Sequence, residues 1–360
     1  MTDMNERVEL LHALVSTPSV SRDEGAVAEV LVDHMNANGF DARVDEVGNA
    51  VGLRSGGPST DGSAQRSLVL LGHIDTVPGD VPIRFEDGAL YGRGSVDAKG
   101  SIATFTRAVL ESTPAPGVDL IVVGAVEEES ETSRGARHAA TQYAPEACLI
   151  GEPSSWDAVT IGYKGCARVE VDFVEPCGHT AGPLPPPSEA AAALWHTLKT
   201  WTLEFNEGKK ALFDHVMPTL IEFNTTSDGL HDRVHLRLGL RLPLDFDITV
   251  IETLLREQAP EAEIRFYGHE VAWASPQTSS LARTLRRAIL QAGGKGTLKR
   301  KTGTSDMNVV GPVWQCPIVA YGPGDSTLDH TPNEHVPLAD YEKAIDVLKA
   351  ALVGGGWAVE

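Results

Sequence analysis

Residues 67–78, SLVLLGHIDTVP, carry an apolar run into a turn that contains a histidine and an aspartate. The run 67–71 has the length of a strand, and its continuous apolar character is typical of a strand covered on both faces. His73 and Asp75 therefore follow a buried strand at its end. In open α/β sheets, ligands bind beyond the carboxyl ends of the strands. One histidine in such a place predicts little unless further metal-ligating side chains reach the same edge.

Three other apolar runs predict strands of the same kind. They are residues 118–126 (VDLIVVGAV), 147–150 (ACLI) and 317–321 (PIVAY). Between the first strand and the second, three apolar residues lie at helical spacing, namely Ile102, Phe105 and Val109. Strands that alternate with helices predict a largely parallel, three-layer α/β sheet.

The segment 164–274 has a different pattern, in which two of the expected strands alternate apolar and polar residues with period two. Its elements follow the order strand, helix, strand, strand, helix, strand, which is that of a ferredoxin-like unit. A chain of 360 residues also exceeds the usual size of one domain. We therefore expect an α/β domain of residues 1–163 and 275–360, into which the α+β domain 164–274 is inserted.

An early helix is expected after Ser21-Arg22-Asp23-Glu24, which has the capping-box pattern. Val27, Val30 and Leu31 continue it at helical spacing. Gly39 is the residue at which we expect this helix to end.

Composition excludes several classes of partner. The chain has 30 Lys and Arg against 50 Asp and Glu, a formal net charge of −20, which repels nucleic acid and anionic membranes. There is no apolar run of about 18 residues, no signal-peptide pattern and no CxxC pair among the four cysteines, so we expect a cytoplasmic protein. Residues 295–301, KGTLKRK, are a local cluster of four cations, either a solvated loop or a docking site for an acidic partner.

Metal-competent side chains follow all four predicted strands or lie in the glycine-rich loop 92–100. They are His73 and Asp75, Glu127–Glu129, Glu152, His330 and, in the loop, Asp97. Each alone has an ordinary structural explanation, such as a hydrogen-bonded histidine or a carboxylate that caps a helix. Their joint arrival at one sheet edge predicts a metal site there.

Imidazole and carboxylate ligands without thiolate suit zinc, cobalt or manganese. Three ligand carboxylates would offset three of the four positive charges of two divalent ions, and the residual charge favours ionising a bridging water. The adjacent Glu127 and Glu128 could supply one base and one ligand. Asp75 is placed to orient His73 and to fix its tautomer.

The chain also resembles a known family. The motifs are GHIDTVP (72–78), GRGSVDAKG (92–100), the glutamates after the second strand, GEPS (151–154), GTSD (303–306) and DHTPNE (329–334). In this order they resemble the ArgE/DapE-type co-catalytic zinc deacylases and carboxypeptidases, and most of all the LysK type. The resemblance implies a zinc domain with an inserted ferredoxin-like lid that often dimerises.

The resemblance implies two Zn²⁺ ions, for which Co²⁺ can substitute. One would be held by His73, Asp97 and Glu152, and the other by Asp97, Glu128 and His330, with Asp97 as the bridge. Glu127 would then be the general base, and Asp75 the residue that orients His73.

The register of the acidic run has an alternative. The family usually shows Asp-Glu-Glu, whereas this chain has Val126-Glu127-Glu128-Glu129. Alignment of Val126 with the aspartate gives the assignment above, and a shift by one residue makes Glu128 the base and Glu129 the ligand. We favour the first register because it keeps the base immediately beyond the apolar strand.

Further residues gain candidate roles from the same resemblance. His179 would stabilise the oxyanion, Arg241 and Asn224 would contact the substrate carboxylate or the oxyanion, and Lys301 could meet a substrate carboxylate. The segment Gly303, Thr304 and Ser305 would line the pocket. Each of these residues could instead have a structural role.

The reaction implied is hydrolysis of an amide. Enzymes of the LysK type release lysine or ornithine from the γ-carboxyl of a glutamate on a small acidic amino-group carrier protein, and the family often forms homodimers. The alternatives are a deacetylase for free N-acetyl-ornithine or N-acetyl-lysine and a succinyl-diaminopimelate desuccinylase. A metal-dependent binding or scaffold protein without catalysis is a further alternative, although it would need no base beside its ligands.

Overall fold

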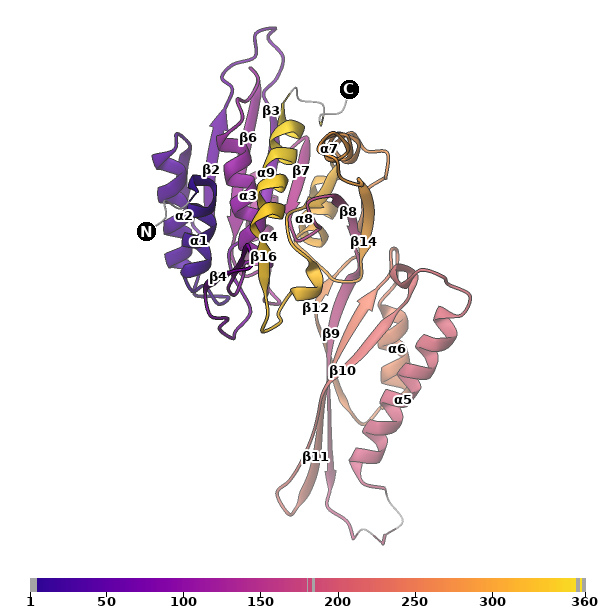
Figure 1. Cartoon of the computed structure of the whole chain (residues 1–360). Helices are drawn as coiled ribbons and strands as arrows, with labels where there is room; N and C mark the ends of the chain where they lie inside the picture. Colours follow the sequence, from indigo (N-terminus) through magenta and orange to yellow (C-terminus); the bar gives the residue numbers. More distant parts are fainter. Residues whose placement is uncertain (1–4, 180, 183–184, 354–356, 358–360) are drawn as a thin grey trace. The chain divides into compact units, whose positions relative to one another are not determined.

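The computed structural model describes residues 5–179, 181, 182, 185–353 and 357 (Figure 1). The described residues form two compact units. The first comprises those of 1–162, 274–300 and 305–360, and the second comprises 163–273 together with 301–304. The segment 301–304 thus belongs to the second unit, whereas its place in the sequence suggested the first.

The first unit is built on a mixed sheet with the strand order β1-β2-β6-β3-β7-β15-β8-β13, and β14 also pairs with β8. The bounds are β1 Asp41–Val44, β2 Ala50–Ser55, β3 Arg66–His73, β6 Val118–Ala125, β7 Ala147–Gly151, β8 Ala158–Tyr163, β13 Trp273–Ala274, β14 Thr297–Lys301 and β15 Ile318–Tyr321. The neighbours β6, β3, β7 and β15 are parallel. They are the four strands predicted from the apolar runs, so the expected α/β class is confirmed.

Helices cover both faces of this sheet (Figure 1). They are α1 Glu6–Ser16, α2 Gly25–Ala37, α3 Lys99–Leu110, α4 Arg134–Gln142, α7 Ser280–Gln291, α8 Met307–Trp314 and α9 Leu338–Leu352. Leu68 and Leu70 of β3 pack into a core with α1, α2, α3, α7 and α9. Val69 and Leu71 are equally buried but point to the opposite face, as alternate residues of a strand do, and there α4 and α8 pack together.

The order of these strands explains where a site can form. The chain moves from β3 to β6 through α3, and then from β6 back across β3 to β7 through α4. Because both crossovers have the same hand, this reversal places the two helices on opposite faces. The carboxyl end of β3 therefore lies at a topological switch point, where open α/β sheets bind their ligands.

The start of α2 differs from the expected capping box. The helix begins at Gly25, and Glu24 at its N-cap position makes no side-chain cap. Ser21 instead donates to Asp75, and the Glu24 carboxylate accepts from the backbone N–H groups of Arg22 and Glu127. The bonds of Ser21 to Asp75 and of Glu24 to Glu127 are tertiary and take the place of the local cap. Gly39, with φ +82°, directly follows the C-cap of the helix, as predicted.

Smaller elements complete the first unit. A three-stranded sheet has the order β16-β5-β4, with bounds β4 Arg84–Glu86, β5 Ala89–Tyr91 and β16 His335–Pro337. A short 3-10 helix, η2 Ser326–Leu328, precedes the DHTPNE segment.

The second unit is a four-stranded antiparallel sheet with the order β10-β11-β9-β12. Its elements are β9 Gly165–Pro176, α5 Pro187–Asn206, η1 Leu212–Asp214, β10 Met217–Ser227, β11 His231–Leu242, α6 Thr249–Gln258 and β12 Glu263–Glu270. Alternate residues of β9 and β11, such as Val169 and Leu238, are buried in a core that α5 and α6 share. The order of strands and helices is that of a ferredoxin-like unit.

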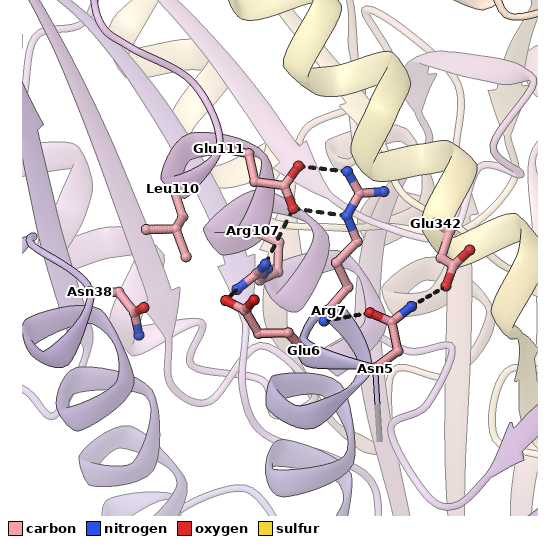
Figure 2. Close-up of a pocket in the computed structure, with 8 residues that line it drawn as sticks. All are labelled: Asn5, Glu6, Arg7, Asn38, Arg107, Leu110, Glu111 and Glu342. Atoms are coloured by element: carbon pink, nitrogen blue, oxygen red, sulfur yellow. Dashed lines mark hydrogen bonds and ion pairs between the residues drawn. The ribbon is translucent and has the colours of Figure 1, made fainter. Parts of the chain in front are cut away.

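Arg7 of α1 and Glu111 at the end of α3 form an ion pair (Figure 2), and Lys349 of α9 lies 3.3 Å from the same carboxylate, so an ionic network joins three helices. Arg7 contacts both oxygens of Glu111 at 2.8 and 2.5 Å and also pairs with Asp346. The buried Arg107 donates to Glu111 as well, at 3.3 Å. The Glu111 carboxylate thus contacts three cations, and Asp346 and Glu6 supply further negative charge to Arg7 and Arg107. Among the helices that the structure describes, none combines the length and apolar character needed to cross a membrane.

The network predicts a specific loss of stability. Glu111→Ala leaves Arg7 paired with Asp346 alone and Arg107 with Glu6 alone among the ion pairs of the described residues, so we expect the free energy of unfolding to fall by about 2 kcal/mol, between the values for exposed and buried pairs. Glu342→Ala is the matched control and should cost under about 0.5 kcal/mol, because Glu342 lines the same pocket as Arg7 and Glu111 (Figure 2) but, among the described residues, its hydrogen bond is to the exposed Asn5. Equal effects of both changes in urea denaturation would show that the network does not stabilise the helices.

Candidate metal centre

His73 is the last residue of β3 and is almost fully buried. Its Nε2 atom lies 3.2 Å from Oδ1 of Asp97 and 3.9 Å from Oε1 of Glu152, the residue that follows β7. Two neighbouring strands and the loop before α3 therefore deliver these three side chains to one point. This is the set that the family resemblance implies for one metal ion.

Asp97 is also shared with a second group. Its other oxygen, Oδ2, lies 3.1 Å from Nε2 of His330, and that nitrogen lies 2.8 Å from Oε1 of Glu129. The donor atoms of His73, Asp97 and Glu129 all lie within 4.8 Å of one another, close enough to hold a metal ion. Because each oxygen of Asp97 faces a different histidine, this aspartate has the geometry of a bridge between two sites.

The contacts of the acidic run differ from those expected in the favoured register, in which Glu128 would lie with Asp97 and His330. The Glu127 carboxylate accepts a hydrogen bond from Thr132 at 2.5 Å and lies 3.5 Å from Arg134, away from the two histidines. Glu129, and not Glu128, contacts His330. The physical reason is a turn at Glu127, whose φ of +60° ends the strand alternation and directs the next two side chains inward.

Glu128 lies beside the donors without joining His330. Burial raises the pKa of its carboxyl well above the usual value, and the charges of Glu152, Asp306 and Glu129 add to the rise, while His73 opposes it. A carboxyl group with a raised pKa beside a metal site has the properties of a general base.

Asp75 connects His73 to the acidic run. The ring Nδ1 of His73 lies 3.0 Å from the backbone oxygen of Asp75 and 3.4 Å from its carboxylate. The same carboxylate accepts the N–H groups of Glu128 and Glu129 at 3.1 and 3.0 Å. Burial alone would raise the pKa of Asp75, but hydrogen bonds from His73, Ser21 and Glu129 outweigh it and lower that pKa.

The donor chemistry fits divalent cations. The cluster contains two imidazoles and at least three carboxylates, the ligands that catalytic zinc sites use. Hydrogen bonds to Asp97 and Glu129 raise the pKa of His330 to about 10, so a proton on Nε2 competes with a metal for that nitrogen and for the carboxylate oxygens that face it.

Glu334 is a residue at the centre that sequence analysis did not assign. It is fully buried, and its Oε1 accepts the N–H groups of Val96 and Asp97 at 3.0 and 3.1 Å. Its Oε2 pairs with Arg93 at 2.7 Å. The last residue of the DHTPNE motif therefore fixes the backbone that carries Asp97, and its position in a motif was the only signal for it.

The remaining predicted residues lie in both units. Ser305 belongs to the first unit and is buried, with its hydroxyl accepting the N–H of Met307 at the start of α8. In the second unit, Arg241 donates to the hydroxyl of Thr304, which lies beside Gly303. Three further residues complete that set: His179, whose Nδ1 accepts the N–H of Ala181; Asn224, exposed on β10; and Lys301, which lies over the ring of Tyr163.

Comparison with known proteins decides the family. The sequence model described as peptidase family M20/M25/M40 matches residues 69–353, most of the chain. The chain belongs to this family. It is 44% identical to a protein of Deinococcus radiodurans named LysW-lysine hydrolase, over 96% of this chain and 97% of that protein. It is 38% identical to a Thermococcus kodakarensis protein with the provisional name LysW-lysine/LysW-ornithine hydrolase, over 97% and 92% of the two chains.

Solved structures agree with the fold. The M20 family metallo-carboxypeptidase Sso-CP2 of Sulfolobus solfataricus superposes with a TM-score of 0.77 over 97% of this chain and 99% of that chain, at 18% identity. Such a likeness shows the fold alone. The family match and the relatives named as hydrolases confirm the prediction that this chain is a hydrolase of a metal-dependent family.

Proposed function

We propose that this M20 family member hydrolyses the amide between lysine, or ornithine, and the γ-carboxyl of the C-terminal glutamate of a small acidic amino-group carrier protein. The observation that carries the proposal is the 44% identity, over nearly the whole of both chains, to a protein named LysW-lysine hydrolase. The name of the Thermococcus kodakarensis relative supports ornithine as a second product. The reaction would serve lysine biosynthesis and, with ornithine, arginine biosynthesis.

The proposed cofactor is a pair of Zn²⁺ ions, with Co²⁺ as a possible substitute. His73, Asp97 and Glu152 would hold one ion, and Asp97, Glu129 and His330 the other. Bound there, the ions would supply Lewis acidity at the scissile carbonyl and at the attacking water. The two-sided contacts of Asp97 support this pairing.

The general base we propose is Glu128, the acidic side chain that lies beside the donors and is left over from the two ligand sets. It would take a proton from the attacking water and return that proton to the leaving amine. Asp75 would hold His73 in one tautomer and fix the backbone of the base. From the family resemblance, His179 remains the proposed stabiliser of the oxyanion, and Arg241 a proposed contact of the substrate carboxylate.

The chemistry of the surface supports an acidic protein substrate. Lys295, Lys299 and Arg300 are exposed at or beside β14, in a chain whose net charge is −20. Such a local cluster can steer an acidic partner toward an otherwise repulsive enzyme. Lys299 also donates to the backbone oxygen of Ser154, so part of the cluster has a structural role. The homodimer and the cytoplasmic location stay predictions.

A comparison of two substrates tests this proposal. We expect zinc-loaded protein to release lysine from the carrier-linked substrate with a kcat/KM at least about 100-fold higher than from free N-acetyl-lysine, because only the carrier contacts the enzyme beyond the scissile amide. Lys295→Glu should raise KM for the carrier substrate and leave hydrolysis of N-acetyl-lysine unchanged.

Other outcomes would reassign the protein. Preference for free N-acetyl-lysine or N-acetyl-ornithine would make it a deacetylase, and preference for succinyl-diaminopimelate would make it a desuccinylase. Zinc binding without turnover of any of these amides would favour a binding or scaffold protein.

A further inference from the structure

Four consecutive backbone N–H groups, those of residues 126–129, are all bonded to side chains from other parts of the chain. Asn49 accepts from Val126 at 3.1 Å, and Glu24 accepts from Glu127 at 3.1 Å. Asp75 accepts from the two residues that follow. Side chains from other parts of the chain therefore fix the backbone of the acidic run at each of these four residues.

Glu24 stands out among these acceptors. It is only 5% exposed, it lies at the N-cap position of α2 without capping that helix, and the reaction proposed above does not use it. One oxygen of its carboxylate, Oε1, accepts from both Arg22 at 2.7 Å and Glu127 at 3.1 Å. A buried carboxylate in this place would be costly without these two bonds.

Glu24 accepts its hydrogen bond from Glu127, the residue at which the backbone of the acidic run turns. If β6 simply continued, alternate side chains would share a face, and Glu127 and Glu129 would point the same way. The φ of +60° at Glu127 breaks that alternation, so Glu127 points away while Glu129 reaches His330. A positive φ is unfavourable for a residue other than glycine and persists only where surrounding contacts hold it.

We propose that Glu24 is a positioning residue that holds this turn and so determines which glutamates face the metal donors. It acts through the backbone of Glu127 and touches neither metal donors nor substrate. Asp75 and Asn49 support the neighbouring residues and also contact His73 and Gly135, respectively. Glu24 is the acceptor for the N–H of Glu127, the residue with the positive φ, so its replacement acts on the turn itself.

The test compares three replacements of Glu24 in the full-length protein, with Zn²⁺ affinity measured by competition against a chelating dye. Glu24→Ala removes both bonds and should weaken binding of the zinc ion assigned to Asp97, Glu129 and His330 about 10- to 100-fold. This is the usual effect of losing a residue that supports a metal ligand. Glu24→Gln keeps the acceptor oxygen and should stay within about threefold of the native chain, because an amide oxygen can accept the same N–H groups. Glu24→Asp keeps the charge but withdraws the single oxygen that accepts both bonds by one methylene, so its effect should fall between those of Ala and Gln.

Two readouts separate positioning from a loss of stability. The absorption spectrum of the Co²⁺-loaded protein should change in the Ala and Asp variants, and kcat should fall while KM stays within about twofold. Val27→Ala, a buried change on the same helix, is the control for stability and should leave metal affinity and spectrum unchanged.

The proposal is overturned if Glu24→Ala and Glu24→Asp both bind zinc and absorb like the native protein. It is also overturned if Gln is as damaging as Ala, because the acceptor oxygen would then not be the operative feature. The inference rests on the metal roles proposed above. Zinc affinity needs no substrate, so a wrong substrate assignment would leave this result unaffected.

Discussion

Glu128→Gln is expected to lower kcat about 1,000-fold while the protein still binds two zinc ions. Glutamine is nearly the same size as glutamate but cannot accept a proton from water, and loss of a general base typically costs 10²- to 10⁴-fold, so about 10³ is the central expectation. Metal content should be unchanged because Glu128 lies outside both proposed ligand sets. Steady-state hydrolysis and zinc content of the purified variant check both parts.

Glu127→Gln is the matched control for this prediction. Glu127 bonds to Thr132 and pairs with Arg134, so its replacement should change kcat less than about threefold, as expected for a partly screened ion pair. If Glu127→Gln were the inactive variant and Glu128→Gln lost a zinc ion, the first register of the acidic run would be right and the proposed one wrong.

Asp97→Ala is expected to abolish tight binding of both zinc ions together with activity. Its two oxygens face His73 and His330 separately, so one substitution removes a ligand from each site. Loss of a direct ligand should exceed the 10- to 100-fold effect known for outer-sphere partners, and we expect both affinities to fall by more than about 100-fold. Zinc titration by calorimetry measures both steps.

Glu152→Gln provides the comparison, because Glu152 is assigned to one site alone. It should weaken one zinc site and leave the other close to its native affinity. If Asp97→Ala and Glu152→Gln both retained one tight zinc ion, Asp97 would not be a bridge.

Most of the fold could be predicted because the deciding patterns are local. The continuous apolar runs that became β3, β6, β7 and β15 need cover on both faces, and only a layered α/β sheet provides that cover. The period-two alternation of β9 and β11 likewise required a sheet with one covered face. The capping box predicted at Ser21 does not form, because the Ser21 side chain bonds to Asp75, a residue 54 positions away.

Four of the proposed metal donors could also be named from the sequence, because His73, Asp97, Glu152 and His330 each stand alone in a motif that resembles the family's. The sequence could not show which glutamate of the acidic run faces these donors. Three identical residues in succession differ only in where the backbone directs each side chain. That direction depends on a single dihedral angle at Glu127, held by bonds to distant side chains. No pattern within residues 126–129 records those bonds.

Glu24 and Glu334 were missed for a related reason. Both are buried carboxylates that accept backbone N–H groups, Glu24 from the acidic run and Glu334 from the loop that carries Asp97. In a sequence, a buried acceptor of this kind looks the same as a surface glutamate. Only the tertiary structure shows which backbone N–H groups such a carboxylate accepts.

The most direct test of the proposed centre is anomalous diffraction at the zinc absorption edge from crystals of the zinc-loaded protein. We expect two zinc peaks that share Asp97, one also coordinated by His73 and Glu152, the other by Glu129 and His330, with Glu128 coordinating neither. A single peak, or a zinc ion coordinated by Glu128 with Glu129 turned away, would contradict the centre described here.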